Sequence, residues 1–321
     1  MSRRLRTLAL LSLTALCASI ASCGGGGGGS TTPVTAGPPP LVRLLDADTP
    51  VVVHVDTASV RQSPYYSLVH DALLNTLSER EQGEFRRVVQ LLDRTDSIVF
   101  GMDPVHDSGA VLFRGAFEPQ HIELLNPPEA TFTYRTHTLR GDERAQGIIT
   151  ADTFVVGSTE VVHRVLDRLD GLSPATGPTL GGFAEAAGRA HLGERDASAV
   201  VLLTAEMRER MGRGDVEDAL REAGLSFGGS LDARNGIRLS AFFTASSEGA
   251  VQLLARQLRE VITEAQQDMT LAMLGLSVLL QQIQIEERGT DLLVEFHLDD
   301  AQVRELLERF GPLLQAVLSM T

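Results

Sequence analysis

The sequence predicts an α+β fold made of two similar halves, each an antiparallel sheet packed with helices. The order strand, helix, hairpin, helix, hairpin, helix is predicted twice along the chain. Hydrophobic residues make up 43% of the 321 residues, which is enough for a sizeable core. Asn235-Gly236 lies between two β-rich runs and is a strong hairpin signal, so consecutive strands are expected to pair antiparallel.

The first half is predicted to begin with a buried, valine-rich strand at 50–56. Ser63-Pro64 then supplies an N-cap and a first helical residue, and Ser78 opens a second helix that runs to about residue 92. The remaining expected elements are strands at 97–102 and 110–116, a short helix at 119–125, a hairpin of 131–139 with 147–156 around Gly141-Asp142, and a helix at 158–169.

A segment rich in Gly and Pro at 171–188 is predicted to connect the halves. The second half is predicted to contain a strand at 199–204, a helix at 216–223, strands at 226–233 and 237–245, and a long helix from 246. A hairpin of 282–287 with 292–298 and a final helix that Asp299 caps are predicted to follow. Val53 and Arg61 align with Val200 and Arg208, which suggests an internal duplication with halves at 46–185 and 186–321.

The first 22 residues have the layout of a secretory signal peptide. Arg3, Arg4 and Arg6 form a positive start, and residues 8–20 form an apolar run. That run is too short to cross a bilayer core of about 30 Å, which needs about 20 residues. The segment is therefore predicted to direct export and then to be removed.

Ile20-Ala21-Ser22-Cys23 follows the apolar run and resembles the lipobox of bacterial lipoproteins. The resemblance implies that the Cys23 thiol receives a diacylglycerol, that cleavage occurs just before it, and that the new amino group is acylated. An ordinary secretory signal with a chance Cys is the alternative. The opening of the body, a Val-rich strand ending in Asp before a Ser-Pro helix, resembles uncharacterised bacterial envelope proteins.

Residues 23–45 are interpreted as the lipidated Cys and a tether rich in Gly and Pro. From residue 24 to 40 a random coil reaches roughly 20–25 Å, which would hold a folded body clear of lipid headgroups. Loss of residues 1–22 removes three Arg and no acid, so the net charge falls from -14 to -17. Gly24 follows the Cys where inner-membrane lipoproteins of enterobacteria carry Asp, so the resemblance favours the outer membrane of the cell envelope.

Composition excludes several classes of function. The acidic chain contains no Lys and no basic run, which makes it a poor partner for nucleic acid. Its two Cys both lie within the first 23 residues, so the body has no disulfide framework and no Cys-based zinc site. The sequence also lacks the serine-hydrolase elbow, the zinc-protease helix and the phosphate loop. No cofactor is expected.

Two His-x-Asp pairs are the candidates for chemistry: His54 with Asp56, and His297 with Asp299. Positions i and i+2 of a strand share a face, so each pair could ligate a metal or act as an acid/base couple. The alternative is structural, because both Asp residues stand where a strand gives way to a helix and an Asp commonly caps the helix.

The apolar run at 271–280 allows three interpretations: a core helix, one wall of a groove for a lipid or partner helix, or a membrane contact. The groove would be lined by Leu271, Leu274, Leu276 and Leu279. Taken together, the sequence predicts a non-enzymatic envelope lipoprotein, anchored through Cys23, whose body binds a partner or has a structural role. A carrier of a small apolar ligand and a hydrolase of unrecognised type are the alternatives.

Overall fold

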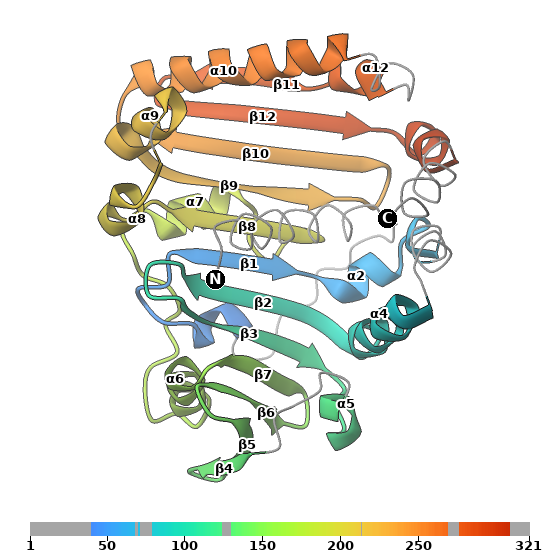
Figure 1. Cartoon of the computed structure of the whole chain (residues 1–321), viewed down its shortest axis with the longest axis vertical. Helices are drawn as coiled ribbons and strands as arrows, with labels where there is room; N and C mark the ends of the chain where they lie inside the picture. Colours follow the sequence, from blue (N-terminus) through green and yellow to red (C-terminus); the bar gives the residue numbers. More distant parts are fainter. Residues whose placement is uncertain are drawn as a thin grey trace, which may run out of the picture.

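The twelve strands of the described chain form one antiparallel sheet with helices on both faces (Figure 1). The computed structural model describes residues 40–67, 70, 79–123, 130–212, 214–268 and 276–308. Strands follow one another across the sheet in the order β11-β12-β10-β9-β8-β1-β2-β3-β7-β6-β5-β4. The predicted α+β class is confirmed.

The strands are β1 (Val51–Val55), β2 (Thr95–Asp103), β3 (Ser108–Gly115), β4 (Thr131–Tyr134), β5 (His137–Gly141), β6 (Arg144–Thr150), β7 (Thr153–Ser158), β8 (Ala197–Leu202), β9 (Gly224–Asp232), β10 (Ile237–Ala245), β11 (Gln284–Arg288) and β12 (Asp291–Leu298). The helices are η1 (Leu41–Leu44), α2 (Thr57–Arg61), α4 (Glu79–Leu92), α5 (Pro119–Glu123), α6 (Thr159–Leu169), α7 (Phe183–Arg189), α8 (Ala205–Glu209), α9 (Asp215–Ala223), α10 (Glu248–Gln267) and α12 (Leu276–Leu280). A further helix, called the 300–308 helix, is described over those residues.

The two halves meet at the pair β1 and β8, where Val52 lies opposite Val200. Outward from this pair the first half reads β1-β2-β3-β7-β6 and the second reads β8-β9-β10-β12-β11. Because β1 and β8 are antiparallel, a two-fold axis normal to the sheet relates the two orders. The predicted similarity of the halves is therefore present in the topology. A rotation about this axis keeps every side chain on its own face of the sheet. Val200 shares a face with Val52, so its structural equivalent in β1 is an even-numbered residue. The sequence alignment of Val53 with Val200 is therefore displaced by one residue.

The predicted hairpin turn around Gly141-Asp142 is present, because β5 pairs with β6 there and Gly141 lies opposite Ala145. The prediction is wrong in one detail: the run 131–139 is divided between β4 and β5, which form a hairpin of their own with Tyr134 opposite His137. β6 then pairs with β7 as a further hairpin. Arg135 starts the two-residue β4–β5 turn with φ at 55°, a conformation that usually selects Gly or Asn. The sequence therefore gives no turn signal there, and the run 131–139 reads as one strand.

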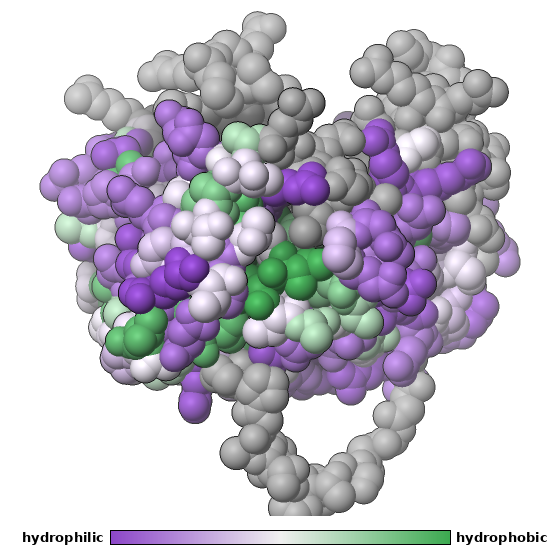
Figure 2. Space-filling view, turned by 90° about the horizontal axis from the view of Figure 1, so that it is seen from below, coloured by the Kyte–Doolittle hydropathy of each residue, from purple (hydrophilic) through white to green (hydrophobic). Residues whose placement is uncertain are grey.

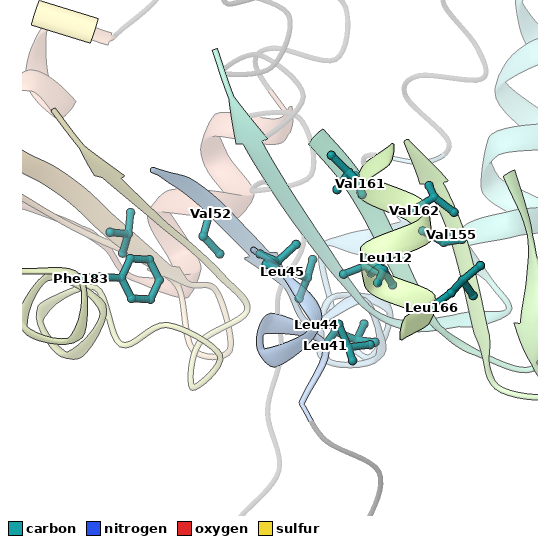
Figure 3. Packing of buried hydrophobic residues seen from close by; sticks show 14 of the residues in the cluster. Leu41, Leu44, Leu45, Val52, Leu112, Val155, Val161, Val162, Leu166 and Phe183 are labelled. Atoms are coloured by element: carbon teal, nitrogen blue, oxygen red, sulfur yellow. The ribbon is translucent and has the colours of Figure 1, made fainter. Parts of the chain in front are cut away.

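One face of the sheet, called the α6 face, is covered by η1, α6 and α7. Helix α6 turns a continuous apolar stripe toward strands β3 and β7, and η1 fills the space beside it (Figure 3). These side chains are almost fully inaccessible: Leu44, Leu112, Val155, Val162 and Leu166 are each 0% exposed. The core of the first half therefore lies between the sheet and α6.

The opposite face, called the α10 face, is covered in the second half by α9 and α10. Val251 and Ala255 of α10 are fully buried against Phe243 of β10 and Leu292 of β12. Ser247 caps α10 by accepting a hydrogen bond from the backbone N–H of Ala250, at 3.4 Å. Small residues on the buried side of α10 let the helix approach the sheet closely.

Candidate functional site

Asp56, one of the predicted site residues, is the N-cap of α2. Its side chain accepts a hydrogen bond of 2.8 Å from the backbone N–H of Ser59. The capping interpretation of this Asp is therefore supported directly by its geometry. His54 lies two residues earlier, on the α6 face, where Val99 and Ser198 are its direct cross-strand neighbours. Burial lowers the pKa of His54 below its usual value, although the charge of Asp56 opposes the shift.

Asp299 caps the 300–308 helix in the same way. Its side chain accepts from the backbone N–H of Gln302 at 2.8 Å, and the backbone N–H of Asp299 donates to the Gln302 side chain at 2.9 Å. This reciprocal arrangement is a capping box. His297 is exposed at the end of β12.

The two His-Asp pairs do not meet. β12 and β1 are separated by β10, β9 and β8, so His297 and His54 stand four strand spacings apart, or about 19 Å. Among the described residues, no group of three or more His, Cys, Asp or Glu side chains is placed to hold a metal ion. The geometry thus places Asp56 and Asp299 in helix caps and their His neighbours on strands of the sheet.

The expected apolar groove falls largely outside the described chain. Leu271 and Leu274 lie outside the described residues, and the side chain of Leu276 does too, although its backbone begins α12. Leu279 is half-buried and packs against a cluster that contains Val55 and Val303. In the part of the chain that is described, no helix is long and apolar enough to cross a membrane. Cys23 also lies outside the described residues.

A buried carboxylate that the sequence analysis missed joins the two halves. Asp196 is 1% exposed and immediately precedes β8. One carboxylate oxygen accepts from the Ser59 hydroxyl at 2.6 Å, and the other accepts from the backbone N–H of Ala233 at 2.8 Å. Arg234 contacts the first oxygen at 3.3 Å. Asp196 therefore ties α2 of the first half to the β9–β10 turn of the second.

Tyr65 makes a second link between the halves. Its hydroxyl donates to Asp300 at 2.6 Å and accepts from the backbone N–H of Gly236 at 3.2 Å. Arg304 pairs with Asp300 at 2.9 Å. Burial, followed by the hydrogen bond to Asp300, raises the pKa of Tyr65 to about 12. No local pattern signals this contact, because the partners are separated by 235 residues in the chain.

An acidic hollow of about 680 Å³ lies between η1, the β2–β3 turn and the start of α6. Its carboxylates belong to Asp46, Asp48, Asp103, Asp107, Glu143 and Glu160. Burial alone would raise the pKa of Asp46, but hydrogen bonds from Arg164 and Arg168 outweigh it and lower the pKa. Those contacts, at 2.9 and 2.6 Å, fasten η1 to α6. Asp46 is therefore occupied in holding the fold together.

A second hollow of about 500 Å³ is mostly apolar and lies between α7 and the ends of β8 and β9. Leu180, Leu202, Leu203 and Leu225 line it, and Arg189 stands at its side. Arg189 is held by Thr244 at 3.0 Å and by Asp291 at 2.5 Å. The volume is within the range of small-molecule sites. Among the described residues that line this hollow, none comes from the run at 271–280.

The overall fold is similar to that of TP0453. A structure of its crystal form III matches with a TM-score of 0.50 at 12% identity, covering 88% of this chain and 99% of that one. Crystal form IV gives a TM-score of 0.48 at 12% identity, over 85% and 96% of the two chains. At this identity the likeness shows the fold alone. No family model and no curated protein sequence matches the chain.

Proposed function

We propose that the chain is a lipid-anchored protein of the bacterial envelope whose body is a non-enzymatic binding or structural module. The observation that carries the proposal is Cys23 at the end of Ile20-Ala21-Ser22, directly after an apolar run of secretory length. A Gly-rich and Pro-rich stretch then separates Cys23 from η1, which begins at Leu41. This spacing suits a folded body held at a short distance from a membrane.

The geometry of the body supports the module interpretation. The two carboxylates that the sequence offered for acid/base or metal chemistry have structural roles. Asp56 and Asp299 cap helices, and their His neighbours stand on strands four spacings apart. The buried Asp196 and Tyr65 are likewise engaged in contacts between the two halves.

Anchoring is tested by metabolic labelling of the full chain with a palmitate analogue. The wild type should carry the label and sediment with membranes, and Cys23→Ala should lose both properties. Several acyl chains bind a membrane firmly, so the loss should be nearly complete. Cys17→Ala is the matched control, because it removes the other thiol and should keep both properties. Membrane retention of an unlabelled Cys23→Ala chain would contradict the lipid anchor.

The membrane that holds the protein is a separate question, which fractionation of the envelope answers. The outer membrane is the expected location, because Gly24 rather than Asp follows Cys23. Recovery of the labelled chain in the inner-membrane fraction would contradict this part of the proposal and leave the anchor intact.

A second candidate function, carriage of a small apolar ligand, is favoured by the apolar hollow beside α7. Native mass spectrometry of the wild type would then show a bound apolar molecule. Leu225→Arg places a charge at the mouth of the hollow, where the side chain is 44% exposed, and should remove that mass without unfolding the chain. Leu172→Arg, at a side chain that is 58% exposed elsewhere, is the matched control. A wild type without added mass contradicts the carrier.

A further inference from the structure

The two outer edges of the sheet differ in chemistry. β11 is the last strand at one edge and β4 at the other (Figure 1). An edge strand presents unpaired backbone N–H and C=O groups to any further strand, and proteins commonly guard such edges with charges or by covering them.

The β11 edge is guarded. Three of its five residues, Glu286, Glu287 and Arg288, are charged, and Arg259 of α10 pairs with Glu287 at 2.6 Å. The two-residue β11–β12 turn makes Arg288 and Asp291 a hydrogen-bonded pair, and bonded and non-bonded pairs alternate from there along the strand. The backbone N–H and C=O groups that point away from β12 therefore belong to Ile285 and Glu287. If a second β11 paired in that register, Glu286 would lie opposite its own copy, and like charges directly opposite destabilise a pair.

The β4 edge is open in the described chain. The backbone N–H of Gly141 donates to the carbonyl of Ala130 at 2.8 Å, which makes residues 130 and 141 a hydrogen-bonded pair. Bonded and non-bonded pairs alternate along an antiparallel ladder, so the N–H and C=O groups of Thr131 and Thr133 point away from β5. Among the described residues, no strand pairs with that side of β4.

The side chains of β4 carry no charge and are held in place from within the protein. Residues 131–134 read Thr-Phe-Thr-Tyr. The Tyr134 ring stacks on His163 of α6 at 3.6 Å with an interplanar angle of 8°, and Phe132 meets the same imidazole edge-on at 6.0 Å. Thr131 and Thr133 are exposed. A strand ordered in advance loses little entropy when it pairs.

We propose that β4 pairs with β4 of a second copy of this chain, antiparallel across a two-fold axis. The outward groups allow a register in which Thr131 of each copy lies opposite Thr133 of the other, and Phe132 lies opposite Phe132. Aromatic pairs and Thr-Thr pairs are among the favoured cross-strand neighbours. No charged residue of β4 faces its own copy in this register, in contrast to β11. The sheets of the two copies become continuous.

The contact at this edge is of modest size. Figure 2 looks onto the end of the molecule at which β4 lies and shows both hydrophilic and hydrophobic surface there. One four-residue strand buries far less than the roughly 1,200–2,000 Å² of a stable interface, so association in solution is weak. Anchoring both copies in one membrane would raise their effective concentration. Only this increase depends on the proposed function; the pairing of the strands does not.

Disulfide cross-linking tests the register. The full chain with Cys17→Ala and Cys23→Ala contains no other Cys, so an introduced Cys is unique and the result is independent of the lipid anchor. Thr131→Cys and Thr133→Cys chains, differently tagged, are mixed and oxidised. A hydrogen-bonded pair has Cα atoms about 5.5 Å apart, within disulfide range, so the mixture should cross-link at least about fivefold more than either variant alone.

Gln284→Cys chains provide the control at the guarded edge, because they keep all three charged residues of β11. Cross-linking of the Thr131→Cys and Thr133→Cys mixture that does not exceed this control overturns the proposal. A cross-linked product of either variant with a different polypeptide also overturns it, because the occupant of the edge would then be another protein.

Thr133→Pro removes the outward N–H and leaves the ladder to β5 intact, as an edge strand tolerates. The weight-average mass of the wild type should rise with concentration toward that of a dimer, and that of the variant should stay monomeric. An unchanged melting temperature shows that the variant is folded. A variant that retains the wild-type concentration dependence, or a wild type that stays monomeric throughout, contradicts the pairing.

Discussion

The two halves of this molecule share a strand order and differ in where their last helix packs. In the first half α6 follows β7 and covers the α6 face, where Val162 meets Val155. In the second half the 300–308 helix follows β12 and packs on the opposite face, where Val303 meets Leu298 and Val55. Similar topology therefore does not decide which face of the sheet a helix covers.

The cause lies in the residues that each strand turns to each face. β7 is apolar on both faces, with Phe154 and Val156 on one and Val155 on the other. β12 alternates: Asp291, Glu295 and His297 share the α6 face with Leu293, and the α10 face is apolar. A helix that packed on the polar face of β12 would leave charged groups buried without water, which is costly. The alternation of polar and apolar side chains along a strand therefore decides which face of the sheet the next helix covers.

The largest expected effect tests this difference with a matched pair of substitutions on the α6 face. Val155→Asp buries a carboxylate at a position that is 0% exposed and should abolish cooperative unfolding of a protein whose total stability is about 5–15 kcal/mol. Leu293→Asp, on the same face of β12, is half-buried beside an open hollow and should cost only about 1–2 kcal/mol. Thermal unfolding followed by circular dichroism measures both. Equal effects would refute the asymmetry of the halves.

An intermediate effect concerns the junction between the halves. Tyr65→Phe removes the hydroxyl that Asp300 and the Gly236 N–H share, and should lower the free energy of unfolding by about 1–3 kcal/mol. The pKa of Tyr65 is raised to about 12, so its contribution is complete below pH 10 and is lost as the pH rises toward 12. Urea titrations across that range should show a steeper loss for the wild type than for the variant.

A double-mutant cycle with Asp300→Ala separates this contact from its surroundings. The two substitutions should couple by about 1 kcal/mol, because they share one hydrogen bond. Strict additivity would show that the hydrogen bond between Tyr65 and Asp300 does not stabilise the junction.

The smallest expected effect is a pH dependence centred on His54. Nδ1 of His54 is buried and has no hydrogen-bond partner among the described residues. Because burial lowers its pKa, the folded protein holds it neutral while the unfolded chain takes up a proton below about pH 6.5. Wild-type stability should therefore fall as the pH drops through 6.5, and His54→Val should weaken that dependence by up to about 1 kcal/mol between pH 7 and 5.

His297→Val, on an exposed side chain of the second half, is the matched control substitution. Chelation by EDTA should not shift the melting temperature of the wild type. A fall of many degrees would return His54, Asp56, His297 and Asp299 to consideration as metal ligands.

Much of the fold could be predicted because its signals are local. Asn235-Gly236 marks the β9–β10 turn, where Gly236 takes a φ of 91°. Asp56 and Asp299 mark helix starts, since a cap bonds to a backbone N–H three residues away. The β4–β5 hairpin carries no such signal, because Arg135 rather than Gly or Asn occupies its left-handed turn position. The Arg135 side chain pairs with Asp167 of α6 at 2.7 Å.

By itself the sequence determined the α+β class, the repeated order of elements and the helix caps. Each of these depends on residues within a few positions of one another. Only the tertiary structure decided that the halves join through β1 and β8, that Asp196 and Tyr65 secure that junction, and that β4 is the last strand of the sheet. Those outcomes depend on contacts between residues up to 235 positions apart, and no local pattern encodes which distant partner a strand or a buried polar group will meet.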